Sequence, residues 1–172
     1  MAETALILID FENEWQDPKS QYYLGDLTSL IKRTNRLIAA ARKQNYKIIF
    51  IRHVEKDSTK EFASKSKNTE IISSINRKAT DLILTKYKIS AFYQTSLEQE
   101  LNGIKNLIIT GILTNLCVRS LVQDAYDREF NITIIKDCCT TFTKKLHNFT
   151  LQDLKETRPE IELQSLKEFL SK

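Results

Sequence analysis

Three residues that could perform covalent chemistry stand at the ends of predicted strands. Asp10 follows an apolar run, Lys86 ends another, and Cys117 stands in the opening turn of a predicted helix just after a third. Ligands of open parallel sheets bind at the carboxyl ends of the strands, which lie along one edge. A carboxylate, an ammonium and a thiol that meet there supply a nucleophile and an acceptor for its proton. We therefore expect these three residues to be catalytic.

Each of the three residues, taken alone, also has a purely structural explanation. An aspartate at a strand end can cap a loop, and a strand-end lysine can lie along the surface with its charged group in water. A lone cysteine is often a small buried apolar residue. The coincidence of all three at strand ends favours the catalytic interpretation.

The position of Cys117 predicts a reactive thiol. In the first turn of a helix, unpaired N–H groups and the positive end of the helix dipole favour the thiolate and can bring the thiol pKa well below about 8.5. Asp10 could accept the thiol proton while the Lys86 ammonium holds its carboxylate in place. The segment Gly111–Cys117 is further expected to form a tight turn whose N–H groups point to one spot, as an oxyanion hole requires.

Short apolar runs recur along the chain and predict the strands that position these residues. The runs occupy residues 5–9, 47–51, 82–85, 107–110 and 132–135. Because they are apolar at successive positions, they are typical of strands buried on both faces of a parallel sheet. Between them, apolar residues recur with helical spacing from Leu27 to Ala41, Thr95–Glu98 has the spacing of a capping box, and a third helix is expected over about 114–128. This alternation predicts an α/β three-layer sandwich with right-handed crossovers.

One segment, Glu55–Arg77, breaks the alternation of strands and helices. It is rich in Lys, Ser, Asn and Glu and has a weak helical pattern at Ile71, Ile72 and Ile75. Because no second core is expected beyond it, we interpret the segment as a partly ordered excursion or lid. The chain of 172 residues is then a single domain that spans residues 1–172.

The composition disfavours several function classes. With three glycines, the chain has no G-x-G-x-x-G fingerprint, P-loop or G-x-S-x-G motif. The net charge of +4 is spread along the chain, and the densest basic stretch, Lys60–Lys67, is interpreted as a solvated loop, so no nucleic-acid partner is expected. Three cysteines and two histidines support neither a disulfide framework nor a zinc site, so we expect reduced thiols, no metal and no cofactor. Neither a bilayer-spanning run nor a secretory leader is evident, which predicts a cytoplasmic protein without membrane partners.

Three blocks of the sequence resemble the isochorismatase-like cysteine hydrolase superfamily, which includes nicotinamidases, N-carbamoylsarcosine amidase, ureidoacrylate and biuret hydrolases, and isochorismatases. Ile9–Trp15 is similar to the family's opening D-M-Q-N-D-F pattern, and Lys86–Leu97 is similar to its K-x-x-x-S-A-F-x-x-T-x-L. Gly111–Val118, followed by Ala125 and Asp137, is similar to its G-x-x-T-x-x-C-V…A…D. The order and spacing of the blocks agree over roughly residues 5–141.

The resemblance implies a Rossmann-like α/β fold with a six-stranded, mostly parallel sheet, and a catalytic Asp–Lys–Cys triad carried here by Asp10, Lys86 and Cys117. It also implies a cis peptide bond between Ile112 and Leu113. Such a bond would let the backbone N–H groups of Leu113 and Cys117 converge as the oxyanion hole. Dimers or larger rings are usual in the family, so a homo-oligomer is expected.

Other positions match or depart from the family pattern. Trp15 stands where the family has an aromatic residue that lines the substrate pocket, whereas Glu12 replaces the usual Gln. Residues 52–57 lack the Asp-x-His motif with which nicotinamidases bind a metal, which disfavours nicotinamidase activity. We interpret His53 as a polar strand-end residue rather than a ligand or a substrate contact. Residues 128–130 replace a glycine-containing turn of the family.

The residues and the resemblance together predict a metal-independent cysteine amidohydrolase that cleaves a C–N bond of a small amide or ureido substrate through a thioester acyl-enzyme. Isochorismatases that act on vinyl ethers often lack the cysteine, so Cys117 favours amide-type hydrolysis. Two alternatives stay open. One is vinyl-ether hydrolysis, in which Asp10 protonates the ether oxygen and the thiol is dispensable, and the other is a catalytically silent oligomeric scaffold.

Overall fold

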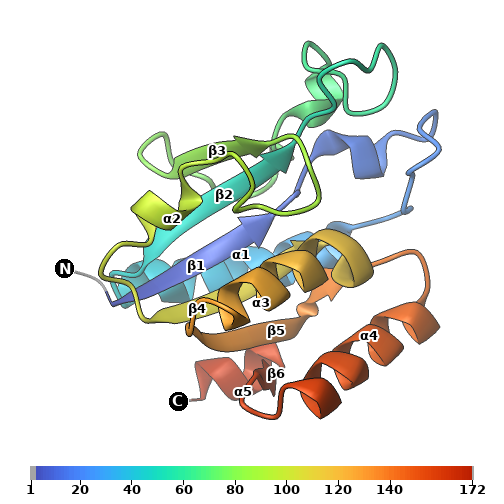
Figure 1. Ribbon diagram of the computed structural model, residues 1–172. Helices are drawn as coiled ribbons and strands as arrows, with labels where there is room; N and C mark the ends of the chain where they lie inside the picture. The colour runs from blue at the N-terminus through green and yellow to red at the C-terminus, as the bar shows by residue number, and fades with distance from the viewer. Residues whose placement is uncertain (1–2, 172) are drawn as a thin grey trace.

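Six parallel strands form the central sheet of the protein, shown in Figure 1 as a computed structural model in which residues 3–171 are described. In chain order the strands are β1 (Thr4–Ile9), β2 (Lys47–His53), β3 (Leu82–Lys86), β4 (Asn106–Ile112), β5 (Asn131–Thr140) and β6 (Glu162–Gln164). All neighbouring strands pair in parallel. The predicted α/β fold with a six-stranded sheet is confirmed. The strand that the apolar runs did not locate is β6, which has three residues and a single apolar side chain.

The strand order creates a switch point beside the centre of the sheet. Across the sheet the order is β3-β2-β1-β4-β5-β6, so the chain first moves outward from β1 to β3 and then returns to the other side of β1 as β4. The helices that follow β1 and β4 pack on opposite faces, which leaves a crevice at the carboxyl ends of these two strands.

Helices cover both faces of the sheet, and β1 alternates between the two layers. Ala5, Ile7 and Ile9 pack in one buried cluster, and Leu6 and Leu8 pack in the other. The first cluster includes residues of α2 (Leu97–Glu100), α3 (Arg119–Tyr126) and α4 (Lys144–Thr157), and the second includes residues of α1 (Thr28–Lys43) and α5 (Leu166–Leu170). Figure 1 shows α1 behind the sheet and α3 in front of it. This burial on both faces explains why the strands are apolar at successive positions.

Three details of the helices differ from the sequence expectation. The capping box at Thr95–Glu98 does not form, because Ser96 is the N-cap of α2 and the Thr95 hydroxyl donates to the Ala91 carbonyl instead. The helix expected over 114–128 begins as a π-helical turn, Thr114–Val118, before α3 follows. The weak helical pattern near Ile71 forms no helix, since Ile71 makes an isolated β-bridge with Glu12. No helix within residues 3–171 is long and apolar enough to cross a membrane.

The excursion at residues 55–77 folds back against the body of the protein. Besides the Glu12–Ile71 bridge, Glu55 makes a bridge with Ala63, and a short 3-10 helix occupies Lys67–Thr69. Phe62, Ile72 and Ile75 of this segment are buried in the same cluster as α1. These contacts make the excursion an ordered part of the structure.

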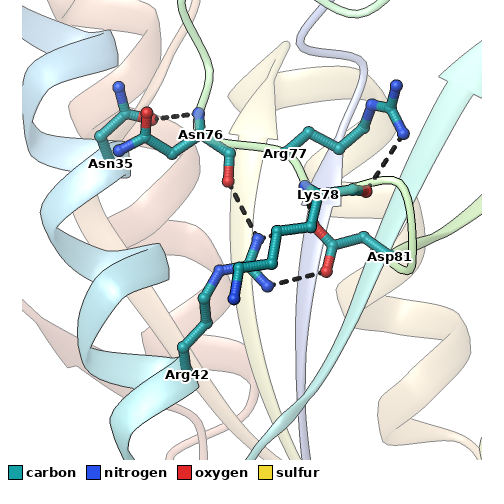
Figure 2. A network of polar contacts seen from close by, with 6 residues as sticks. All are labelled: Asn35, Arg42, Asn76, Arg77, Lys78 and Asp81. Atoms are coloured by element: carbon teal, nitrogen blue, oxygen red, sulfur yellow. Dashed lines mark hydrogen bonds and ion pairs between the residues drawn. The ribbon is translucent and has the colours of Figure 1, made fainter.

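A polar network fastens the end of the excursion to α1, as Figure 2 shows. Arg42 donates to both carboxylate oxygens of Asp81, at 2.8 and 2.6 Å, and to the carbonyl of Asn76 at 2.9 Å. Asn35 precedes Arg42 on the same helix. Its side chain accepts the Asn76 N–H at 2.8 Å and donates to the Ser74 carbonyl. The chain therefore enters β3 from a fixed position.

Candidate active site

Asp10 is positioned by the end of the central strand. It follows β1 directly, has the left-handed backbone conformation with φ 55°, and donates its N–H to the Ile51 carbonyl of β2 at 2.8 Å. Aspartate tolerates this conformation better than most residues, because its short polar side chain can interact locally. The side chain is fully buried, and both of its oxygens are without a hydrogen bond of good geometry. The buried Asp10 carboxylate, at the switch point of the sheet, is therefore able to accept further hydrogen bonds.

Lys86 reaches this carboxylate from the edge of the sheet. It is the last residue of β3 and pairs with His53 of β2, so its backbone lies two strand spacings from β1, roughly 10 Å. The extended side chain spans this gap, and its Nζ lies 2.9 Å from Asp10 Oδ2. It also donates to Cys117 Sγ at 3.2 Å. The structure thus brings the three predicted residues together, and their catalytic role stays a prediction.

Cys117 is carried by the π-helical turn that follows β4. The peptide bond between Ile112 and Leu113 is cis, as the resemblance implies. The N–H groups of Leu116 and Val118 both donate to the Leu113 carbonyl, at 3.2 and 3.1 Å, and so close the turn. Leu113 and Cys117 both line the cavity described below, and their N–H groups stay candidates for the oxyanion hole.

Gly111 has a different role from the one expected. It lies within β4 rather than in the turn, next to Ile9 of β1. A Cβ at this position would lie 2.8 Å from the Ile9 Cβ, closer than real Cβ atoms approach one another. Glycine is therefore required by the close approach of β1 and β4, immediately before Asp10 leaves the sheet.

The Cys117 thiol is not activated in the way the sequence predicted. Burial raises its pKa above the ordinary value, the Asp10 carboxylate raises it further, and the Lys86 ammonium opposes both. The prediction of a lowered pKa was wrong, because the dipole of one helical turn is a smaller effect than the loss of solvation. The resting sulfur is a thiol, which needs a proton acceptor beside it when it attacks.

Lys86 stays charged in spite of its burial. Burial alone would lower its pKa, but the Asp10 carboxylate and Cys117 reverse the direction, so that the pKa lies above its usual value. An unpaired ammonium would be unstable in a site with no solvent exposure. Lys86 and Asp10 consequently form a charge-balanced pair next to the sulfur.

A cavity of about 390 Å³ opens beside these groups. Asp10 and Cys117 contribute to its wall, together with an aromatic cluster in which the ring centroids of Trp15 and Phe62 are 5.2 Å apart. Trp15 also donates its indole N–H to the Asp10 carbonyl. Tyr22 completes the cluster at 5.2 Å from Phe62. The cavity suits a small molecule with a flat apolar part, and Trp15 lines it as the resemblance implies.

His53 lies on the wall of the same cavity. It is both the last residue of β2 and a cavity residue, so the strand-end interpretation describes only part of its position. Its Nε2 lies 2.7 Å from Glu55 Oε1, whereas Nδ1 is buried without a hydrogen bond. Burial lowers the His53 pKa, and nearby Lys86 lowers it further. Within residues 3–171 no group of three or more His, Cys, Asp or Glu side chains is arranged to hold a metal ion.

Sequence reasoning missed several residues of the site. Phe62 and Glu55 come from the excursion, which therefore forms a wall of the cavity. Phe62 is the only aromatic residue in an otherwise polar stretch, a signal that could have identified it. Tyr22 and Leu116 had no comparable signal, because each is one of many apolar residues near a turn.

The family model described as "Isochorismatase domain" matches residues 4–163, which is most of the chain. The chain belongs to the isochorismatase family. The family match covers strands β1 to β5, the first two residues of β6, and all the site residues described above.

Individual relatives of this isochorismatase-family chain agree with that assignment. The uncharacterized isochorismatase family protein YaaI of Bacillus subtilis is 29% identical over 163 residues, covering 87% of each chain. Nicotinamidase 3 of Arabidopsis thaliana is 27% identical over 165 residues, covering 87% of this chain and 79% of the relative. The crystal structure of N-carbamoylsarcosine amidase from Thermoplasma acidophilum superimposes with a TM-score of 0.81 at 19% identity, covering 96% of this chain and 97% of the other. The last likeness shows the shared fold.

Proposed function

We propose that this isochorismatase-family hydrolase cleaves the C–N bond of a small amide or ureido compound through a thioester on Cys117. The observation that supports the proposal most directly is the contact of the Lys86 ammonium with both Asp10 and Cys117, at 2.9 and 3.2 Å. The names of two relatives, a nicotinamidase and an N-carbamoylsarcosine amidase, point to the same bond type.

In the first half-reaction, Asp10 removes the thiol proton as Cys117 Sγ attacks the carbonyl carbon. The C–S bond forms, and the carbonyl π electrons move to oxygen, where the N–H groups of Leu113 and Cys117 are proposed to stabilise the negative charge. The intermediate then collapses. Its C–N bond breaks, and Asp10 returns the proton to the leaving nitrogen, so that ammonia or an amine departs.

In the second half-reaction, water attacks the thioester. Asp10 accepts a proton from the water, the C–S bond breaks, and the proton returns to the sulfur. The raised pKa of Cys117 suits this order of reaction steps, because the thiol is the stable resting form and its proton moves to Asp10 only during attack. Lys86 is proposed to hold Asp10 in place and to stabilise the sulfur while it is negatively charged.

The test is turnover by a Cys117→Ala variant. Ammonia release is measured on a panel of nicotinamide, ureido acids, biuret and carbamoyl compounds, and substrates are incubated with the wild-type protein to trap a mass-shifted adduct on Cys117. We expect Cys117→Ala to abolish turnover, whereas Cys138→Ala, which removes a thiol buried in β5, keeps it.

Retained turnover in Cys117→Ala would contradict the thioester mechanism. It would favour hydrolysis in which Asp10 protonates the substrate directly, as in the vinyl-ether reaction considered above. Absence of both turnover and an adduct across the panel in the wild-type protein would favour the silent scaffold.

A further inference from the structure

Glu12 is a buried carboxyl that the proposed mechanism does not use. It stands two residues after Asp10, has no solvent exposure, and donates its backbone N–H to the Asp10 carbonyl at 2.9 Å. Its Oε1 accepts the backbone N–H of His53, at the end of β2. Its Oε2 is buried and has no hydrogen-bond partner. Glu12 is therefore a buried neighbour of the site and is held to the end of β2, the strand that lies between those of Asp10 and Lys86.

The charges in this part of the structure do not balance if Glu12 is ionised. Asp10 and Glu12 are both fully buried, and the single fully buried cation among residues 3–171 is Lys86. Two carboxylates that share one ammonium leave a surplus negative charge on side chains that have no solvent exposure, which is strongly unfavourable. A neutral Glu12 leaves the ion pair of Asp10 and Lys86 intact.

The groups around Glu12 act on it in opposite directions. Burial and the Asp10 carboxylate hold the pKa of Glu12 well above its usual value. The His53 N–H, Lys86 and Arg52 favour ionisation but do not outweigh burial. Arg52 itself donates to the Thr85 hydroxyl at 2.9 Å, so it is directed to β3.

We propose that Glu12 is a positioning residue that carries its proton in the active enzyme, and that its ionisation at alkaline pH switches the site off by competing with Asp10 for the Lys86 ammonium. The effect on hydrolysis rests on the proposed function. The protonation state of Glu12 does not, because it can be measured without a substrate.

The first experiment compares the stability of Glu12→Gln and wild type from pH 5 to 10 by urea unfolding. The Gln amide keeps an acceptor for the His53 N–H and cannot ionise. A carboxyl whose folded pKa is raised favours folding below its unfolded pKa, roughly 4.3, and that contribution is lost as the pH rises through the folded pKa. We therefore expect the ratio of the two unfolding equilibrium constants to change by about tenfold per pH unit in that window, in favour of Glu12→Gln. A ratio independent of pH would overturn the proposal.

Infrared spectroscopy of the wild-type protein gives a measurement that does not depend on the variant. We expect the carbonyl stretch of a buried protonated carboxyl at pH 7, its disappearance at alkaline pH, and its absence from Glu12→Gln where that variant folds. A wild-type spectrum at pH 7 without this band would also overturn the proposal.

The switch itself is tested by the pH dependence of kcat/KM. Wild type should lose activity on the alkaline side, and Glu12→Gln should retain activity to higher pH. The matched control is Glu14→Gln, because Glu14 is also buried but accepts the Phe62 N–H at 3.1 Å. Its alkaline limb should coincide with that of wild type, whatever the change in maximal rate. Identical alkaline limbs in wild type and Glu12→Gln would refute the switch, even where the stability measurement supports a neutral Glu12.

Discussion

Replacement of Lys86 by methionine should destabilise the protein far more than the loss of an ordinary ion pair. Both Lys86 and Asp10 have no solvent exposure, and 2.9 Å separates Nζ from Oδ2. Removal of one partner leaves an uncompensated buried charge, which costs about 3–5 kcal/mol. With an m-value of about 2 kcal/mol/M, the urea midpoint at pH 7 should fall by roughly 2 M. The measurement is equilibrium urea unfolding followed by circular dichroism.

Two comparisons make this prediction specific to a buried charge. Lys47→Met removes an ammonium 2.7 Å from Glu100, but these side chains are 34% and 35% exposed, so the cost should stay below about 1 kcal/mol. The double variant Asp10→Asn/Lys86→Met has no orphaned charge and should recover about 1–3 kcal/mol relative to the sum of the single variants. Additive losses in the double variant, or a loss for Lys86→Met no larger than that for Lys47→Met, would refute the reasoning.

Two further predictions concern Gly111 near the end of β4 and Cys117 in the turn that follows it. Gly111→Ala should lower the free energy of unfolding by about 1–3 kcal/mol through overpacking, seen as a lower thermal midpoint, and should also lower hydrolase activity, because a new Cβ pushes against Ile9 beside Asp10. Gly103→Ala is the control for activity: a Cβ there meets no atom within 4 Å, so activity should be kept, although the φ of +79° at Gly103 makes the substitution cost some stability. Full activity in Gly111→Ala would contradict the packing account. Because the pKa of Cys117 is raised, alkylation of its thiol by iodoacetamide should be slow at pH 7 and should accelerate as the pH rises. It should be faster at each pH in Asp10→Asn, because the Asp10 carboxylate is one of the groups that raise this pKa. Mass spectrometry after timed quenching measures the labelling, and rapid labelling of wild type at pH 6 would contradict the prediction.

The sequence was most informative where a residue's position follows from general rules of the sheet. Runs of successive apolar residues located five of the six strands, because strands buried on both faces need no polar positions. Asp10 and Lys86 could be placed at one edge from their strand ends alone, since parallel strands end on the same side. What the rules could not give was that Lys86 reaches across β2 to Asp10, which depends on the strand order.

The sequence was least informative about solvation. The thiol of Cys117 was expected to be acidic from its place in a helical turn, but its pKa is set mainly by burial, which distant segments produce. Phe62, on the same cavity wall, comes from the polar excursion. The form of the excursion itself depends on contacts such as the bridge of Ile71 to Glu12, for which no local pattern exists.

The central position of β1 has a consequence for how the chain is made. One side of β1 pairs with β2, which follows soon in the sequence, but its other side pairs with β4, where Thr4 is opposite Asn106. On a ribosome that adds about 5–20 residues per second, that side lacks its partner for roughly 5–20 s. The most apolar strand of the protein is thus a nascent edge during synthesis, the stage at which chaperones would protect it from pairing with other chains.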